Sequence, residues 1–221
     1  MKIIIISMFL SSFCFSKQPI SGNRFEHLTG IRNFEDTQGL WDSKYRKSTF
    51  VFGKTPAKFL AENFSYLPSK SKVLDMGMGE GRNAVFLAKK GHQVVGVDIS
   101  SVAVKKSYLL AKEFGVKIKG IVASLNDYNL KSESFDAIIC FYYVDRSLLD
   151  RIYSWLKPGG ILIYEAHTIK EKKQNPKLKS DKDSYFLKEK ELLTIFPKYR
   201  VLKYEEPLHE REFRSSIILQ K

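Results

Sequence analysis

The sequence predicts an α/β fold with a mostly parallel sheet, helices on both faces and an added C-terminal antiparallel strand. Two observations predict it. From about residue 70 onward, short apolar runs alternate with amphipathic helical segments, a pattern typical of parallel strands joined by crossover helices. The last two apolar runs have no helix between them, which favours an antiparallel pair. With 221 residues, 43% of them hydrophobic and 28% charged, the chain has enough apolar material for one domain core.

The elements follow from apolar patterning and from helix caps, taken in chain order. Strands are expected at residues 73–75, 93–98, 116–122, 135–142, 161–166, 199–205 and 213–219. Helices are expected from the turn after residue 75 to Lys90, from a cap at Ser100 or Ser101 to Gly115, and over residues 148–156 and 188–196. Pro158 to Gly160 is predicted to form a turn, and the Lys-rich stretch 170–183 a surface loop. In such a sheet, ligands bind beyond the carboxyl ends of the central strands.

The N-terminal residues predict a secretory signal. Lys2 precedes an apolar run from Ile3 to Phe15, and small residues at 14 and 16 favour cleavage after Ser16. The alternatives are a mis-assigned start codon or an N-terminal strand of a cytoplasmic protein. No run approaches the ~20 apolar residues of a membrane-spanning helix. We therefore expect a signal peptide over residues 1–16, export to the periplasm or outside the cell, and no stable membrane span after cleavage.

The remaining chain divides into an N-terminal arm or lid over residues 17–50 and one main domain over residues 51–221. Its 37 basic residues exceed its 24 acidic residues by 13, which favours anionic partners such as nucleic acid. The two cysteines, Cys14 and Cys140, and the four scattered histidines do not have the spacing of metal ligands, so no metal site is expected. Cys140 is interpreted as a small core residue.

The segment from Asp75 to Asn83, with glycines at 77, 79 and 81, carries the chemistry. Glycines let the backbone turn sharply and approach a ligand at the start of a helix. Arg82 stands where a dinucleotide-binding fingerprint needs glycine, and no P-loop lysine is present. Carboxylates at 75 and 80 repel a pyrophosphate but suit a cation. Asp98, which ends the next strand, is placed to accept hydrogen bonds from ribose hydroxyls. The pattern therefore indicates S-adenosylmethionine.

These segments resemble the successive motifs of class I S-adenosylmethionine-dependent methyltransferases. The matching stretches are VLDMGMGEGRN, VVGVDIS, SFDAIICFY and LKPGGILIYE, in the right order over residues 70–167. The stretches 41–60 and 185–193 are similar to the tellurite-resistance and thiopurine-type subgroup, which acts on small molecules. The Lys-rich stretch and the signal-like start depart from that subgroup. The resemblance implies a Rossmann-like, seven-stranded sheet.

The resemblance also implies a role for individual residues. Gly77, Gly79 and Gly81 would bracket the methionine moiety, with Asp75 near its ammonium group. Asp98 would hold the ribose. The adenine would be contacted by Ile99, Ser124 and Leu125, and Phe141 would lie near the methyl donor. Trp41 and Tyr45 would either close over the cofactor or pin the arm to the core.

We expect methyl transfer to a small-molecule acceptor by direct displacement, which needs alignment and exclusion of water more than a covalent nucleophile. Tyr142 and His167 are the candidate catalytic residues, and Arg46, Arg82 or the lysines of stretch 170–183 are candidates for orienting an anionic acceptor. Glu205, His209 and Arg211 either face the substrate or are solvated charges. An RNA methyltransferase is one alternative, although residues 142–145 lack the prolines of amino-methylating nucleic-acid enzymes. A non-catalytic exported ligand-binding module is the other. A monomer is expected.

Overall fold

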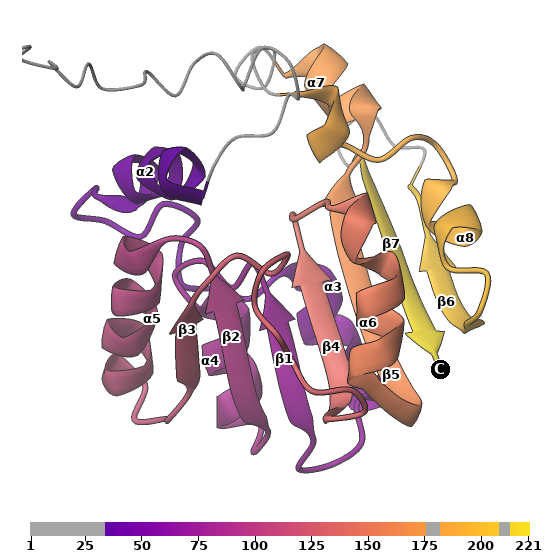
Figure 1. Cartoon of the computed structure of the whole chain (residues 1–221), viewed down its shortest axis with the longest axis horizontal. Coiled ribbons are helices and arrows are strands. Elements are labelled where there is room, and N and C mark those ends of the chain that lie inside the picture. The colour runs from indigo at the N-terminus through magenta and orange to yellow at the C-terminus, as the bar shows by residue number, and fades with distance from the viewer. Residues whose placement is uncertain (1–33, 176–181, 208–212) are drawn as a thin grey trace, which may run out of the picture. The chain divides into compact units, whose positions relative to one another are not determined.

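A computed structural model describes residues 34–175, 182–207 and 213–221. The predicted signal peptide and the part of the arm before residue 34 lie outside these ranges. The described residues form a seven-stranded sheet with the order β3-β2-β1-β4-β5-β7-β6 (Figure 1). Its strands are β1 (Lys72–Met76), β2 (Gln93–Asp98), β3 (Lys119–Val122), β4 (Phe135–Phe141), β5 (Leu156–His167), β6 (Arg200–Glu205) and β7 (Arg214–Gln220). Strands β1 to β5 pair in parallel, and β7 is antiparallel to both β5 and β6. The predicted fold class is confirmed.

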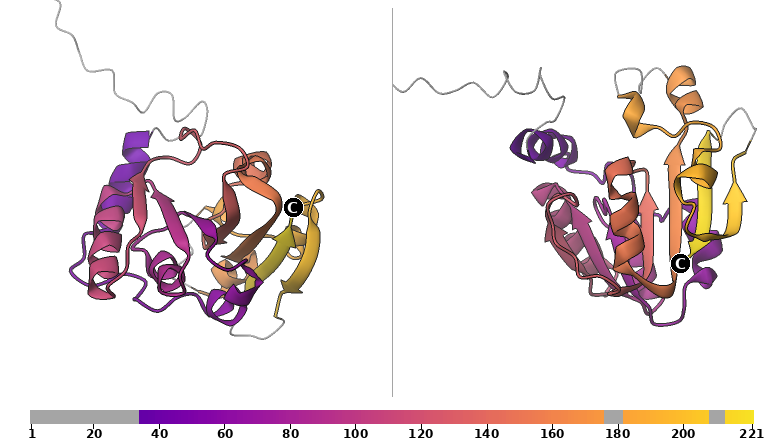
Figure 2. Two further views of the ribbon diagram at one scale, coloured as in Figure 1. Left: turned by 90° about the horizontal axis from the view of Figure 1, so that it is seen from below. Right: turned by 45° about the vertical axis from the view of Figure 1, so that its right-hand side comes forward.

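Helices lie on both faces of this sheet (Figures 1 and 2). They are α2 (Phe34–Tyr45), α3 (Lys58–Asn63), α4 (Arg82–Lys89), α5 (Ser101–Glu113), α6 (Leu149–Trp155), α7 (Ile169–Gln174) and α8 (Glu191–Ile195), with short 3₁₀ turns at Phe64–Tyr66, Arg146–Leu148 and Asp183–Tyr185. Ser100 caps α5, because its hydroxyl accepts a hydrogen bond from the Ala103 N–H at 3.0 Å. Among the described residues, no helix is both long and apolar enough to cross a bilayer.

The core has two layers because side chains alternate along buried strands. On β4, Ile138 belongs to a cluster with residues from α6 and α8, whereas Ile139 belongs to a cluster with residues from α3, α4 and α5. Both isoleucines are fully buried. Burial on both sides explains why β4 is a nearly continuous apolar run in the sequence, as expected of a central parallel strand.

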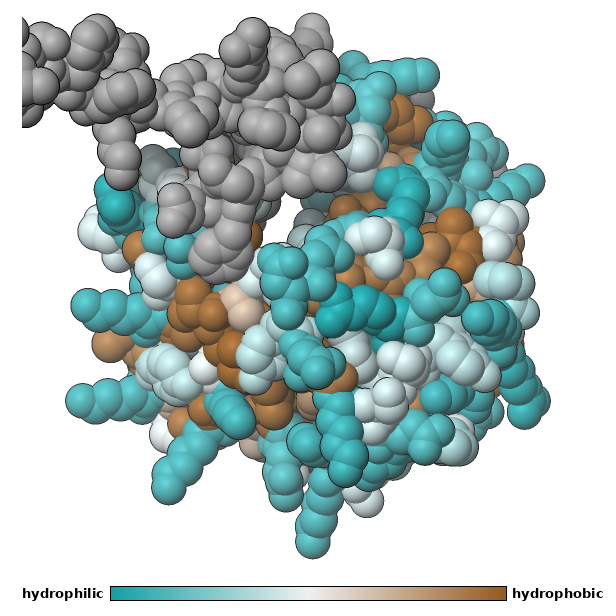
Figure 3. Space-filling model, viewed as in Figure 1, coloured by the Kyte–Doolittle hydropathy of each residue, from teal (hydrophilic) through white to brown (hydrophobic). Residues whose placement is uncertain are grey.

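One part of the sheet lacks a helix. The link from β3 to β4 over residues 123–134 forms turns only, so the α6-side face of β1 to β3 carries apolar side chains that stay partly accessible. Val95, Ile121 and Leu130 are among them, and Figure 3 shows apolar surface in this region between polar rims. This stretch joins the two strands without adding a layer.

Two local predictions were wrong. The expected turn at 158–160 is an irregularity within β5, because Leu156 already pairs with Phe135 before the register shifts. The stretch predicted as a loop at 170–183 begins with helix α7, since Glu and Lys favour helices even where the segment is too polar to form a core. The predicted arm contains helix α2, for which the sequence gives no clear periodic signal because the helix is only weakly amphipathic.

Candidate functional site

The carboxyl ends of β1, β2, β4 and β5 meet at one edge of the sheet, and the glycine-rich loop lies there after β1. Its three glycines have positive φ angles, 64° at Gly77, 57° at Gly79 and 84° at Gly81, which only glycine adopts without strain. Gly81 is the N-cap of α4. A Cβ atom on Gly81 would lie 2.6 Å from the Ser107 Cβ, so glycine is also required for packing between α4 and α5. The loop is thus fixed by its own conformation and by α5.

Two buried carboxylates flank the loop. Asp75, at 2% exposure, has an Oδ2 atom with no hydrogen-bond partner among the described residues. Burial, reinforced by the charge of Asp98, raises the pKa of Asp75 to about 8. Asp98 accepts hydrogen bonds from the Gly79 N–H at 2.7 Å and the Ser100 N–H at 2.8 Å. Burial outweighs these bonds and raises the pKa of Asp98 to about 6. Burial thus disfavours the ionised form of both aspartates, and a bound cation would offset that cost.

Helix α2 is attached to the beginning of α5. Asp42 accepts hydrogen bonds from the Ser100 hydroxyl at 2.6 Å and from the Val102 N–H at 3.1 Å, so it acts as a second cap of α5. The Gln38 side chain donates to the Ile99 carbonyl at 3.0 Å. These contacts place helix α2 of the arm directly beside Ile99, the residue that follows Asp98.

The predicted arm aromatics reach the glycine loop. Tyr45 is buried, and its hydroxyl lies 3.0 Å from the position that a Cβ of Gly79 would take. Trp41 is half-buried and stacks on Tyr45, with ring centroids 5.9 Å apart. Tyr45 thus covers the loop, while Trp41 supports it from outside.

A buried ion pair holds the segment after α2. Lys106 pairs with Glu80, and their side chains are 12% and 3% exposed. The same ammonium group donates to the carbonyls of Tyr45 at 3.2 Å, Lys47 at 3.0 Å and Thr49 at 2.8 Å. Glu80 also accepts from the Val51 N–H at 2.7 Å. One lysine of α5 and one carboxylate of the glycine loop therefore organise residues 45–52.

The other side of the site is built after β4 and β5. Tyr143 lies against Gly77, 3.1 Å from the position that a Cβ there would take. Tyr142 has a φ of 60°, an uncommon conformation for a bulky residue that is often found at functional sites. Its hydroxyl donates to Glu165 at 2.6 Å, and the second oxygen of Glu165 accepts from the Ser216 hydroxyl at 2.7 Å. Burial and this carboxylate raise the pKa of Tyr142, so the phenol stays protonated.

Three further side chains surround the Tyr142 ring. The His167 ring lies 4.9 Å away between centroids, and the guanidinium groups of Arg82 and Arg214 lie 5.4 Å and 5.6 Å from the ring centre. Burial lowers the pKa of His167, which favours the neutral imidazole, and its Nδ1 atom is buried without a partner among the described residues. Both candidate catalytic residues thus belong to one cluster.

Some predicted residues have other surroundings. Phe141 and Leu125 are buried in the two core clusters, on opposite faces of the sheet. Ser124 is half-buried, and its hydroxyl accepts from the Asn126 N–H at 3.2 Å. Cys140 is fully buried, which confirms its assignment to the core. Arg46 and Glu205 are exposed, and His209 and Arg211 lie outside the described residues.

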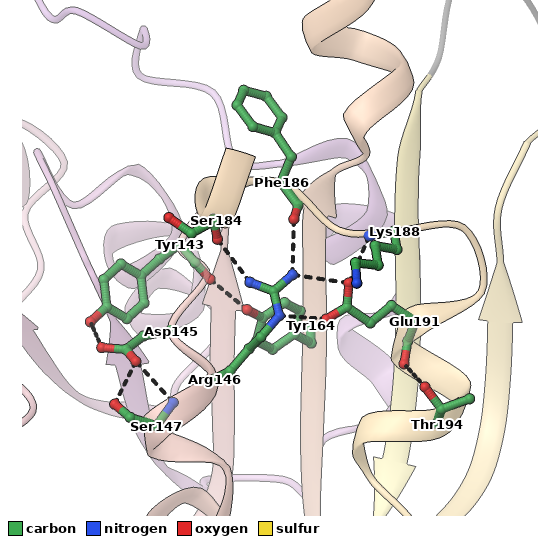
Figure 4. A network of polar contacts seen from close by, with 10 residues as sticks. All are labelled: Tyr143, Asp145, Arg146, Ser147, Tyr164, Ser184, Phe186, Lys188, Glu191 and Thr194. Atoms are coloured by element: carbon green, nitrogen blue, oxygen red, sulfur yellow. Dashed lines mark hydrogen bonds and ion pairs between the residues drawn. The ribbon is translucent and has the colours of Figure 1, made fainter. Parts of the chain in front are cut away.

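Arg146 connects this edge to the segment before α8 (Figure 4). Its guanidinium group forms two bonds to Glu191, at 2.5 Å and 2.9 Å, and donates to the carbonyls of Ser184 at 2.8 Å and Phe186 at 2.9 Å. Tyr143 and Tyr164 lie in the same network, since the Tyr164 hydroxyl donates to the Tyr143 carbonyl at 2.6 Å. The loop that places Tyr143 on the glycine loop is therefore tied to residues 184–191.

Sequence reasoning missed several of these residues. Glu80 was noticed only as a charge that repels phosphate, and Lys106 only as one lysine of an amphipathic helix. Glu165 and Arg214 were assigned to strands without a role. The signal available for Glu165 was a glutamate near the end of an otherwise apolar, buried strand, because a charged residue there needs a partner.

Known proteins share this fold. Residues 73–160 match a family model described as methyltransferase domain. Over 111 residues the chain is 34% identical to the tRNA 5-carboxymethoxyuridine methyltransferase of Escherichia coli K12, a match covering 45% of this chain and 42% of that protein. It is 33% identical over 101 residues to the ubiquinone biosynthesis O-methyltransferase of Xanthomonas axonopodis pv. citri, covering 43% and 42%. The matches thus span less than half the length of these relatives.

A solved S-adenosylmethionine-dependent methyltransferase from Mesorhizobium loti aligns with a TM-score of 0.59 at 15% identity, covering 75% of this chain and 98% of that one. The fold is that of class I S-adenosylmethionine-dependent methyltransferases, and residues 73–160 within it match the methyltransferase domain. S-adenosylmethionine is the cofactor of this class of domain. The similarity to tRNA and ubiquinone methyltransferases leaves the acceptor open.

Proposed function

We propose that this chain transfers a methyl group from S-adenosylmethionine to a small-molecule acceptor. The observation that carries the proposal is the buried, unpaired Oδ2 atom of Asp75 beside the three glycines. A carboxylate without a partner is costly inside a protein. The ammonium group of the cofactor's methionine moiety would offset that cost.

The residues present fit the rest of this cofactor. Asp98 uses one acceptor position on each oxygen for the amides of Gly79 and Ser100, and each oxygen keeps another for a ribose hydroxyl. Ile99 and Ser124 follow β2 and β3 at the same edge and would contact the adenine. We place Leu125 and Phe141 behind this surface as packing residues, because both are buried in the core.

When bound, S-adenosylmethionine supplies an activated methyl group on a sulfonium that leaves as a neutral thioether. The chain's residues then need to align the acceptor and exclude water. Tyr45 and Tyr143, which lie over Gly79 and Gly77, are placed to exclude water. His167, neutral and with a free Nδ1, is placed to accept a proton from an acceptor hydroxyl or thiol. Tyr142 is placed to position the acceptor, since its own hydroxyl is bonded to Glu165.

An RNA acceptor is the rival, and one observation favours it. A groove of about 700 Å³ lies beside the amino ends of β1 to β3, and its lining includes four lysines, Lys72, Lys117, Lys119 and Lys131. Phosphates would bind such a surface. The groove lies at the opposite end of the strands from the glycine loop, one strand length away, or about 17 Å for five residues. A small acceptor enclosed at the carboxyl edge explains, more directly than an RNA acceptor does, why aromatic side chains cover the glycine loop.

Cofactor binding is tested by titration calorimetry of the full chain with S-adenosylmethionine. We expect a Kd in the micromolar range, about −8 kcal/mol, and no binding of NAD. The variant Asp98→Ala should weaken binding at least about tenfold, since it removes charge-assisted hydrogen bonds of ~1.5–3 kcal/mol each. Asp150→Ala is the matched control, because its carboxylate is 91% exposed and remote from the loop. Equal affinity in folded Asp98→Ala and Asp150→Ala proteins would remove Asp98 from the cofactor site.

The acceptor class is tested by transfer of a labelled methyl group to thiols, phenols, carboxylic acids and total RNA. Label in small molecules, unchanged when Lys117 and Lys119 are both replaced by Glu, supports the proposal. Label confined to RNA and lost in that double variant would establish the rival.

A further inference from the structure

Two positively charged side chains, Arg82 and Arg214, lie against the Tyr142 ring at the candidate site. Arg82 begins α4 directly after the glycine loop, and Arg214 begins β7 beside the end of β5. Both are half-buried, and among the described residues neither forms an ion pair. Arg82 makes two long bonds of 3.4 Å to the carbonyls of Phe52 and Thr55. Partly desolvated guanidinium groups are normally paired, so this arrangement calls for an anion.

The two arginines converge from distant parts of the sequence. Their guanidinium carbons lie 5.4 Å and 5.6 Å from the centre of the same ring, that of Tyr142. Glu165, the carboxylate bonded to Tyr142, already accepts hydrogen bonds from the hydroxyls of Tyr142 and Ser216. The guanidinium groups of Arg82 and Arg214 therefore keep donors available to a ligand.

The position of this pair relates it to the acceptor rather than to the cofactor. Asp75 and Asp98 flank the glycine loop on the cofactor side of the edge, whereas the guanidinium groups of Arg82 and Arg214 lie at the Tyr142 ring, which follows β4. The His167 ring, whose Nδ1 atom has no partner among the described residues, lies on the same Tyr142 ring. A ligand held there would have an anionic group at the arginines and a flat part near Tyr142 and His167.

We propose that the methyl acceptor is a small aromatic or conjugated carboxylate whose negative group pairs with Arg82 and Arg214. The inference rests on the proposed function and names its substrate class. Arginine suits this task because its planar fork matches the two oxygens of a carboxylate. The aromatic cluster of Tyr142 and His167 supplies ring-edge contacts for a conjugated body. The methyl group goes to a nucleophilic atom elsewhere on the acceptor or to the carboxylate itself, while the sulfonium leaves as a thioether and any displaced proton goes to His167.

The test uses matched acid and amide pairs, among them 4-hydroxybenzoate with 4-hydroxybenzamide, 3-mercaptobenzoate with 3-mercaptobenzamide, and cinnamate with cinnamamide. Binding to the full chain saturated with S-adenosylhomocysteine is measured by ligand-detected NMR, so that turnover is not required. We expect at least one acid to bind about tenfold more tightly than its amide. Arg214→Gln should remove that preference, and Arg214→Lys should restore only part of it, because lysine keeps the charge but not the fork.

Arg200→Gln is the matched control, since it removes a positive charge from an exposed residue at the other end of the β6–β7 pair. It should leave the preference for the acid unchanged. Acids that bind no better than their amides, in all pairs, overturn the proposal whether or not any is methylated. A preference that survives Arg214→Gln overturns it as well. Failure of the proposed function has a different signature, because S-adenosylhomocysteine itself would then not bind.

Discussion

Replacing Lys106 by methionine should release the segment that covers the glycine loop. Methionine keeps the length and the apolar stem of the side chain but removes the ammonium group. That group pairs with Glu80 and donates to three backbone carbonyls, those of residues 45, 47 and 49. The substitution therefore breaks four interactions at once and leaves the Glu80 carboxylate, 3% exposed, with only backbone amides as partners.

The magnitude follows from this burial. Removing one partner of a buried ion pair typically costs about 3–5 kcal/mol, because the remaining charge stays desolvated. The amides of Val51 and Phe52, which donate to Glu80 at 2.7 Å and 3.4 Å, retain part of the stabilisation. We therefore expect about 3 kcal/mol. Since about 1.4 kcal/mol corresponds to a factor of ten, local opening of residues 45–52 should become about a hundred times more frequent.

Hydrogen exchange followed by mass spectrometry measures this opening directly. Peptides that cover residues 45–52 should exchange about a hundred times faster in Lys106→Met, while peptides from β4 and β5 should keep their protection. The affinity for S-adenosylmethionine should fall, because Tyr45 would no longer be held over Gly79. Lys105→Met is the control, since Lys105 is exposed on the same helix.

Unchanged exchange in Lys106→Met would refute the reasoning. So would strict additivity in a double-mutant cycle with Glu80→Gln. In the double variant neither side chain carries a buried charge without a partner. Residues 45–52 should therefore open less readily than in Lys106→Met alone.

Three further changes have expected outcomes. Asp75→Asn should be more stable than wild type at pH 8 but not at pH 4. Burial raises the pKa of Asp75 in the folded state from 3.8 to about 8, so the stability of the wild type falls as the pH rises between these values. Urea unfolding at several pH values measures this difference. Gly81→Ala should lower the unfolding midpoint much more than Gly91→Ala does. Gly91 has a similar positive φ, but the position of its Cβ is surrounded by open space. Equal midpoints for the two variants would contradict the packing argument. Arg146→Leu should speed proteolysis within residues 182–191, because two carbonyls and Glu191 lose their donor, and an unchanged cleavage rate would contradict this.

Much of the fold is predictable from the sequence because each parallel strand is marked both by a run of apolar residues and by the turn or capping residue that follows it. The run ending at Asp75 is apolar and stops at a glycine turn, and the run ending at Asp98 stops at a capping serine. Each boundary combines two independent signals. Helix α2 has neither, since its residues are mixed in polarity, and it is held mainly by contacts with α5 that are 58 to 61 residues away in sequence.

The sequence marks the cofactor side of the candidate site by one local pattern, whereas on the acceptor side it names Arg82, Tyr142 and His167 singly and does not name Arg214. The glycines and the two aspartates lie close together in the sequence, and their spacing expresses one local geometry. The acceptor side combines Arg82, Tyr142, His167 and Arg214, which are spread over 133 positions and meet only through the order of the strands. No local pattern encodes the placement of Arg214 beside β5, because it depends on the antiparallel pairing of β7.

The attachment of α2 bears on the order in which ligands enter and leave. Its side chains Asp42 and Gln38 bond to α5 and to the two residues before that helix, and the segment after α2 is bonded by Lys106 of α5. No bond of this kind links α2 to β4, β5 or β7 within the described ranges. The cover therefore belongs to the cofactor half of the edge and leaves the half with Arg214 accessible. Such an arrangement should give ordered sequential kinetics, in which the cofactor binds first and the demethylated cofactor leaves last. While the cover stays closed over the cofactor, several acceptor molecules can bind and leave in turn.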